Sequence, residues 1–204
     1  MKRIGLLLLA AILFFSSCVE REHTIYIYAT TDVHGNYIGE NSLSNVKSYV
    51  DLKRAEYGEK SVFLIDNGDH LQGTNAAYYF NFKDTTGGKH LFTRVMENIG
   101  YDAVVMGNHD IEAGHPVYDK VDAEMSIPYL AANAISEETG RPYFREYAII
   151  KKGGVKVAVI GFQNPNISQW LAYSLWEGIK FVPTYPMADS LVKVVRQREN
   201  PDVV

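Results

Sequence analysis

Three short stretches of this chain place carboxylate, amide and imidazole side chains where apolar runs end. They are Asp32-Val33-His34, Gly68-Asp69 and Gly107-Asn108-His109-Asp110, and the last directly follows the apolar run Ala103–Met106. The first two could be ordinary turns, because Gly, Asn and Asp favour turns without any ligand. Asn-His-Asp is a less usual turn, and it offers three groups that can bind a metal or transfer a proton. Oxygen and imidazole donors from three loops indicate half of a two-metal hydrolytic site, and no later stretch supplies the other half.

The spacing of these stretches places them at one edge of a sheet. Asp69 lies 37 residues after Asp32 and Asn108 lies 39 residues after Asp69, each step being one strand–helix–strand unit. Parallel strands joined in this way end at the same edge, where α/β proteins bind their ligands. In an extended segment the side chains of Asp32 and His34 also point to one face and can chelate one ion. A shared metal site is therefore a better interpretation than three unrelated turns.

The rest of the pattern predicts the elements that position these loops. Apolar or alternating runs predict strands, and apolar residues at helical spacing predict helices. We expect strands over 24–29, 62–65, 103–106 and 129–132, helices near 42–57, 91–99 and 117–125, a hairpin of 143–150 with 155–160, and a last helix near 186–198. Strands that alternate with helices favour an α/β fold. Residues 200–204 read as a turn followed by the start of another strand, so we expect a fragment or a truncated gene product.

The composition is that of a single globular domain. The chain has 204 residues, of which 47% are hydrophobic and 22% are charged, and this is enough to build a sizeable core. The formal net charge is −4. A chain without a basic excess is a poor match for a phosphate backbone, so no nucleic-acid duplex is expected as a partner.

The N-terminus has the pattern of an export signal. Lys2 and Arg3 precede the apolar stretch Ile4–Phe15, which is too short for a membrane span and ends at Ser16-Ser17-Cys18. Cys18 is the only cysteine, which excludes an internal disulfide, and Phe15–Cys18 resembles a bacterial lipobox. We therefore expect a lipoprotein-type signal peptide over 1–17, lipidation of Cys18, a tether over 18–23 and a folded part over 24–204. The alternative is ordinary signal cleavage nearby with an incidental cysteine.

These features place the chain outside the cytoplasm. We expect it in the periplasm or at the cell surface, with membrane contact only through a lipid at Cys18.

The three motifs resemble those of calcineurin-like metallophosphoesterases, and specifically of the exported 5′-nucleotidase / 2′,3′-cyclic-nucleotide 2′-phosphodiesterase family. The matching stretches are Thr31–Asn36, Asn67–Gly73 and Gly107–Asp110, with weaker matches at Tyr101–Ala103 and Val159–Phe162. The resemblance implies a layered α-β-β-α sandwich. This chain would hold the N-terminal part of that catalytic domain and would be incomplete at its C-terminus.

The resemblance also implies a role for each metal ligand. Asp32 and His34 would hold a first divalent ion, Asp69 would bridge two ions, and Asn108 would bind the second through its amide oxygen. Mixed Asp, Asn and His ligands suit Mn, Fe or Zn better than Ca. A hydroxide activated by the two ions would then attack the phosphorus of the substrate.

His109 would not be a ligand in this family. It would lie over the phosphate and stabilise or protonate the departing oxygen, with a carboxylate that orients it. In the 5′-nucleotidases that carboxylate lies three residues after the histidine, where this chain has Glu112 in place of the usual Asp. Asp110 is the local alternative.

Some parts of the family pattern are missing. A lone His and a Gly-His-x-His segment would follow Val204, as would the C-terminal domain that binds the nucleobase. None of the other four histidines replaces those ligands. His70 could support the site from behind, and His23 lies in the tether. His90 is expected to start a helix at the surface, and His115 is expected to begin a helix rather than to line the pocket.

Two other features are interpreted structurally. Tyr78-Tyr79 follows the second motif, and packing is a better interpretation than substrate contact. Gln163–Asn166 follows a predicted strand and is expected to be a loop, although it could approach the site.

The first functional hypothesis is an exported phosphoesterase that acts on nucleotides, of which these residues alone would be poorly active. One alternative is the same chemistry on a non-nucleotide phosphoester. The other is a non-catalytic surface lipoprotein with remnant metal motifs.

Overall fold

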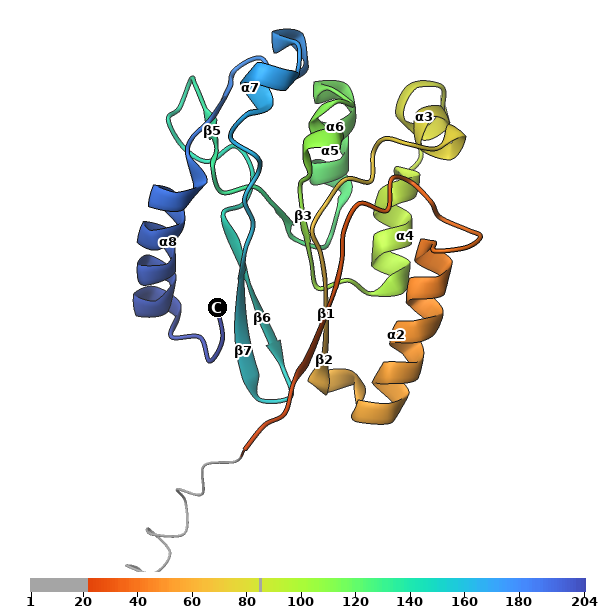
Figure 1. The fold of residues 1–204 in the computed structure, drawn as a ribbon, viewed down its shortest axis with the longest axis vertical. Coiled ribbons are helices and arrows are strands. Elements are labelled where there is room, and N and C mark those ends of the chain that lie inside the picture. Colours follow the sequence, from red (N-terminus) through yellow and green to blue (C-terminus); the bar gives the residue numbers. More distant parts are fainter. Residues whose placement is uncertain (1–21, 85) are drawn as a thin grey trace, which may run out of the picture.

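A parallel sheet of four strands lies at the centre of the computed structural model, which describes residues 22–84 and 86–204 (Figure 1). The predicted signal peptide and Cys18 lie outside the described residues. The strands are in the order β1 (Tyr26–Thr30), β2 (Val62–Asp66), β3 (Ala103–Val105) and β4 (Tyr129–Leu130). β1 and β2 are paired along their whole length, and all three pairings in this sheet are parallel. All four strands therefore end at one edge, as the spacing of the motifs predicted.

Helices cover one face of this sheet (Figure 1). They are α2 (Leu43–Tyr57), α3 (Asn75–Phe82), α4 (Leu91–Ile99), the short α5 (Asn108–Ile111) and α6 (His115–Glu124). In α4, Phe92, Met96 and Ile99 follow the helical period and are buried against the sheet. Gly100 ends α4 with φ 80, a left-handed conformation that costs least for glycine.

A second layer of strands covers the other face. β6 (Tyr147–Lys152) and β7 (Val155–Ile160) form an antiparallel hairpin around Gly153-Gly154, and α8 (Thr184–Glu199) lies outside the hairpin. The hairpin is joined to the central sheet after β4, where the amide of Ala132 donates to the carbonyl of Gly161 at 2.8 Å. The order of layers is helices, sheet, hairpin, helix. This confirms the expected α-β-β-α sandwich.

Smaller elements connect these layers. A second antiparallel pair joins β5 to β8, and short helical turns complete the connections. Their bounds are β5 (Ala134–Ser136), β8 (Ile179–Phe181), α7 (Ile167–Trp170), η1 (Glu59–Ser61) and η2 (Tyr173–Leu175). Val203 forms a parallel bridge with Val157 of β7, so residues 200–204 do include the start of another strand, as predicted. Within the described residues, no helix has the length and hydrophobicity needed to cross a bilayer.

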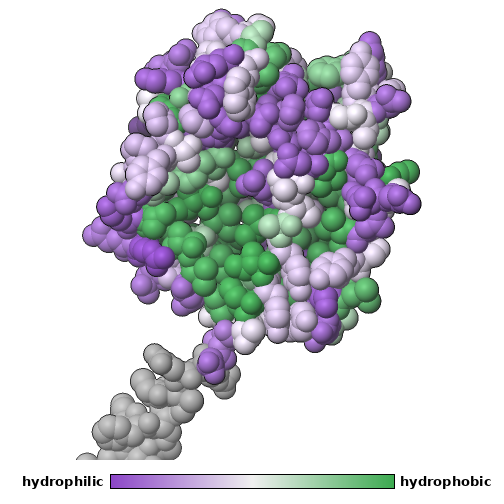
Figure 2. Space-filling model, in the orientation of Figure 1, coloured by the Kyte–Doolittle hydropathy of each residue, from purple (hydrophilic) through white to green (hydrophobic). Residues whose placement is uncertain are grey.

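The side of the molecule between α8 and β1 exposes an apolar surface to solvent. Figure 2 shows apolar side chains gathered between α8 and β1, over the hairpin. Along β1, Tyr26 and Tyr28 pack toward the helices, so the alternate residues Ile25 and Ile27 face the hairpin side. Ile27 is 47% exposed. β1 is thus an edge strand whose inner face is only partly covered.

Two predictions about side chains are wrong. His90 is buried rather than at the surface, because it is the N-cap of α4 and its Nδ1 accepts from the Phe92 amide. Burial lowers the pKa of His90 to about 4, so its ring is neutral near pH 7. Tyr78 and Tyr79 are about half exposed rather than packed, because α3 buries only Ala77 against the core.

Candidate metal centre

The three motif loops meet at the carboxyl edge of the central sheet. The amide of Asp32 donates to the carbonyl of Gly68 at 3.0 Å, and the amide of His34 donates to that of Asp69 at 2.8 Å. Asp32, His34 and Asp69 all have positive φ, at 54°, 50° and 65°. Left-handed backbone at non-glycine residues costs about 1–3 kcal/mol each and tends to persist at functional sites. Three such residues in two facing loops therefore mark this edge as the functional region.

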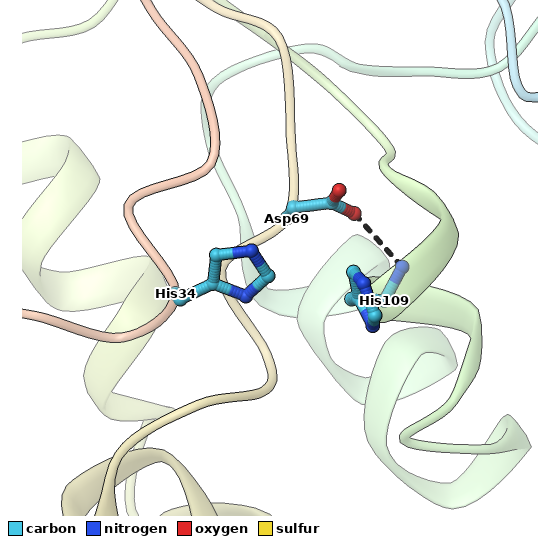
Figure 3. Close-up of side chains that lie close together, drawn as sticks. All are labelled: His34, Asp69 and His109. Atoms are coloured by element: carbon cyan, nitrogen blue, oxygen red, sulfur yellow. Dashed lines mark hydrogen bonds between the residues drawn. The ribbon is translucent and has the colours of Figure 1, made fainter.

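Three possible metal ligands point toward one another across these loops (Figure 3). One donor atom each from His34, Asp69 and His109 lies within 4.8 Å of the other two. The amide of His109 also donates to Asp69 Oδ1 at 2.8 Å, which links the second and third loops. The cluster includes His109, which the family resemblance treats as a proton donor rather than a ligand. The geometry thus brings His109 within reach of anything that Asp69 binds.

The other predicted ligands line an adjoining cleft. Asp32, Asp69 and Asn108 all face a cavity of about 450 Å³. His34 Nε2 lies 3.9 Å from Asp32 Oδ1, so these two side chains are directed to the same point. The four predicted metal ligands are therefore brought together, with Asp69 common to both groups.

Glycine allows the second and third loops to touch. A Cβ atom on Gly107 would lie 2.0 Å from Asp69 Oδ1, and one on Gly68 would lie 2.3 Å from the Gly107 nitrogen. Real Cβ atoms do not approach other atoms so closely, and Gly68 also has φ 93. These two glycines are therefore required by the contact between the loops.

Asp110 is buried beneath this contact and does not face His109. Its carboxylate accepts four backbone N–H groups, from Asp69 at 3.1 Å and from His70, Leu71 and Gly107 at 2.8 Å each. A carboxylate with this many donors is well satisfied in the interior. Asp110 therefore ties the second loop to the third, and its oxygens are engaged by these backbone groups.

Glu112 occupies that position instead. Glu112 Oε1 lies 3.0 Å from His109 Nδ1, and both side chains are about one third exposed. Burial alone would lower the pKa of His109, but the contact with Glu112 and its charge outweigh burial and raise it. The three-residue spacing on α5 and its C-cap is what allows this contact.

The cleft favours a cation. Burial raises the pKa of Asp69, the hydrogen bond from the His109 amide partly opposes this, and the charges of Asp110 and Asp32 raise it further. Carboxylates that crowd one another in this way are stabilised by a bound divalent ion. The donor set of carboxylate, imidazole and amide oxygen therefore fits such an ion.

His70 lies behind the second loop, away from the cleft. It is fully buried, its ring stacks on Phe92 at 4.9 Å, and its Nε2 lies 2.7 Å from Asp66 Oδ1. Burial would lower the pKa of His70, but the charge of Asp66 outweighs this and raises it. His70 thus packs against the core beneath Asp69.

His115 begins α6 as expected and is not among the residues that line the cleft. It pairs with Asp119 at 3.0 Å, and its other ring nitrogen contacts the carbonyl of Glu177 at 2.9 Å.

The loop after β7 contributes one wall of the cleft, which the sequence left undecided. Phe162, Gln163, Asn164 and Pro165 all line it. Gln163 is buried, and its side-chain amide donates to the carbonyl of Gly107 at 2.7 Å. A Gln and an Asn within four residues of the end of a strand of the second layer were the signal that this loop faces the site.

Comparison with known proteins agrees with this fold. Residues 25–204 match the calcineurin-like phosphoesterase family, and the chain belongs to that family. It is 28% identical to a 5′-nucleotidase of Vibrio cholerae over 191 residues, which is 91% of this chain and 33% of that protein. It is 26% identical to a 2′,3′-cyclic-nucleotide 2′-phosphodiesterase/3′-nucleotidase of Yersinia enterocolitica, covering 82% of this chain and 29% of that protein.

Solved structures show the same fold. The calcineurin-like phosphoesterase YfkN of Bacillus subtilis superposes with a TM-score of 0.75 at 24% identity, covering 88% of this chain and 60% of that chain. The chain spans about a third of the length of the curated relatives that it matches.

Proposed function

We propose that the protein is an exported, metal-dependent phosphoesterase that hydrolyses nucleotides. The observation that carries the proposal is the convergence of Asp32, Asp69 and Asn108 on one cleft at the edge of the sheet. Asp32 and His34 would hold one divalent ion, Asn108 would hold a second, and Asp69 would bind both. Mn, Fe and Zn match this donor set. When bound, such ions would neutralise phosphate oxygens and activate the attacking water.

The protein's own contribution to the reaction is the handling of a proton. His109 lies beside Asp69 with Glu112 at its Nδ1. Since Glu112 favours the protonated ring, His109 can carry a proton at Nε2 toward the departing oxygen of the substrate. Transfer of that proton would neutralise the leaving alkoxide as the phosphorus–oxygen bond breaks.

The proposal that the substrate is a nucleotide rests on the names of the relatives. Their names specify 5′-nucleotidase and 2′,3′-cyclic-nucleotide 2′-phosphodiesterase/3′-nucleotidase, which share a phosphoester beside a ribose. A phosphoester without a base remains the alternative substrate, because no described residue here is assigned to a nucleobase.

We also propose that additional strands complete the domain in the working protein. The open apolar face between β1 and the hairpin supports this, since exposed apolar patches of this kind usually mark a contact surface. Among residues 22–84 and 86–204, no imidazole other than those of His34 and His109 reaches the cluster around Asp69. Strands added beside β7 could bring the missing imidazoles to the second ion, and a C-terminal domain could bind the base. Residues 24–204 alone are therefore expected to have little activity.

Export and anchoring are proposed from the N-terminal sequence. Residues 1–17 would direct the chain out of the cytoplasm, and a lipid on Cys18 would hold it at a membrane facing the periplasm or cell exterior.

A hydrolysis assay tests the proposal: it measures released phosphate for the monoesters and the ring-opened nucleoside monophosphate for the cyclic nucleotides. Residues 24–204 and the complete product of the gene would each be assayed with Mn²⁺, Fe²⁺ or Zn²⁺ on nucleoside 5′-monophosphates, 2′,3′-cyclic nucleotides and p-nitrophenyl phosphate. We expect metal-dependent turnover of a nucleotide by the complete product and little by residues 24–204. A complete product that binds metal and turns over none of these esters would support the non-catalytic alternative.

A further inference from the structure

The ring of His34 has a polar neighbour on the side of each of its nitrogens. Nε2 faces Asp32, at 3.9 Å from Oδ1, and Nδ1 lies 3.0 Å from the side-chain oxygen of Gln72. Gln72 belongs to the second loop, three residues after Asp69. A side chain of one metal loop thus contacts the ligand supplied by another.

This contact determines which ring nitrogen is free. A neutral imidazole carries one N–H, and a metal binds the nitrogen that lacks it. If Nδ1–H donates to Gln72, Nε2 keeps its lone pair on the side that faces Asp32. The reverse tautomer would place N–H on Nε2, where the Asp32 carboxylate at 3.9 Å is too far to accept a hydrogen bond. Only the first arrangement leaves each nitrogen with a suitable partner once an ion is bound.

From this contact we infer that Gln72 is a positioning residue: it selects the Nδ1–H tautomer of His34 and aims Nε2 at the metal. It acts through His34 and touches neither metal nor substrate. The inference rests on the proposed function only in taking the partner of Nε2 to be a divalent ion.

The backbone around Gln72 holds it in place. A Cβ atom on Gly73 would lie 2.5 Å from the carbonyl oxygen of His34, so glycine allows this loop to lie directly against His34. On either side of Gln72, Thr74 Oγ1 donates to the carbonyl of Gly35 at 2.8 Å, and Asn81 Nδ2 donates to that of Leu71 at 2.6 Å. Gln72 is itself exposed, but its backbone neighbours on both sides are fixed. The contact is therefore built into the loop.

The first test reads the tautomer without any metal. Long-range ¹H–¹⁵N NMR of residues 24–204 at about pH 8, where histidine is mostly neutral, would report which nitrogen of His34 carries the proton. We expect Nδ1–H in the parent chain and a mixture of tautomers in Gln72→Leu. The matched control is Gln169→Leu, which removes an exposed glutamine of α7 that donates to the N-cap residue Asn166, and it should leave His34 unchanged. Nε2–H in the parent chain, or an unchanged spectrum in Gln72→Leu, would overturn the inference.

The second test reads metal affinity. We expect Co²⁺ binding, followed by its visible absorption, to weaken about 10- to 100-fold in Gln72→Leu, as it does when groups that support a ligand are removed. Gln72→Glu keeps an acceptor of the same length and should restore binding, whereas the shorter Gln72→Asn should not. An affinity in Gln72→Leu within about twofold of the parent would count against a positioning role.

The two tests separate this inference from the proposed function. If Co²⁺ fails to bind the parent chain, or binds Asp32→Asn equally well, the metal site itself is wrong. The tautomer measurement on the metal-free chain would still decide whether Gln72 controls His34.

Discussion

The two sides of the candidate metal centre are built to different degrees. On the side of Asp32 and His34, two backbone hydrogen bonds, a glutamine contact and a close-packed glycine hold the ligands. On the side of Asn108, the cleft is open, and the described residues offer it amides and a phenylalanine but no further imidazole. Under the proposed function, the central sheet alone would hold one ion. A second ion would depend on what the second layer of strands provides.

The largest effect is expected from the residue that the two sides share. Replacing Asp69 with Asn should lower the turnover of the complete gene product by about a thousandfold, equivalent to about 4 kcal/mol of transition-state stabilisation, because an amide cannot bridge two ions. Phosphate release at saturating metal measures this. Turnover within about tenfold of the parent would exclude Asp69 as the bridge.

A substitution at Asp110, beneath the contact between the second and third loops, should destabilise both loops. Asp110→Asn should lower the free energy of unfolding by about 3 kcal/mol, because an amide nitrogen would face N–H groups that need an acceptor. Urea unfolding of residues 24–204 measures the change. Asp189→Asn in an exposed pair on α8 is the control and should change it by about 0.5 kcal/mol or less. Equal effects of the two substitutions would contradict the role given to Asp110.

Metal affinity should distinguish the two sides directly. In residues 24–204, Asp32→Asn should weaken Co²⁺ binding about 100-fold, or about 2.7 kcal/mol, whereas Asn108→Ala should change it by about threefold or less. The reason is that only the first side is complete in these residues. Isothermal calorimetry provides both constants. A larger loss from Asn108→Ala would reverse the comparison.

The free energy of unfolding should fall as the pH is lowered, because His90 supports the loop that holds Asp69. His90 Nε2 contacts Asn81, which in turn bonds the carbonyl of Leu71 in the second loop. Because burial lowers the pKa of His90 to about 4, the unfolded state binds a proton first as the pH falls below about 6.5. The contribution of His90 is therefore present at pH 7 and should decrease by about 2 kcal/mol by pH 5.

Comparing His90→Gln with the parent chain isolates this effect, since glutamine does not titrate. The variant should lose less stability than the parent between the two pH values in urea unfolding. If all proteins in this test start at residue 22, the exposed His23 gives the matched control, and His23→Gln should leave the pH dependence of that parent unchanged.

Local pattern was enough to predict the sheet, the motif loops and their meeting at one edge. The strand over 62–65 is an uninterrupted apolar run, and Gly100 follows apolar residues at helical spacing. The neighbouring sequence is therefore enough to predict this strand and the end of this helix. Glu112 was predicted as a neighbour of His109 because three residues span most of a helical turn.

Contacts made by backbone atoms from distant loops could not be predicted. Asp110 has four partners that come within reach only when the second and third loops fold together. His90 looked like a surface residue because a polar side chain at a helix start is normally solvated, and its burial depends on Asn81 and Phe92. The prediction for Tyr78 and Tyr79 was wrong in the opposite sense: they were expected to pack and are half exposed. The local sequence does not show which side of α3 meets the core.

The direction of β1 has a consequence for how the molecule meets its surroundings. This strand starts at Tyr26, beside the turn of the hairpin where His23 packs near Gly154, and it ends at Thr30, two residues before Asp32. Five extended residues span about 17 Å, so the chain enters the domain at the end remote from the cleft. The start of the described chain and the mouth of the cleft therefore lie toward opposite ends of β1, so small solutes can reach the cleft without passing the N-terminal segment.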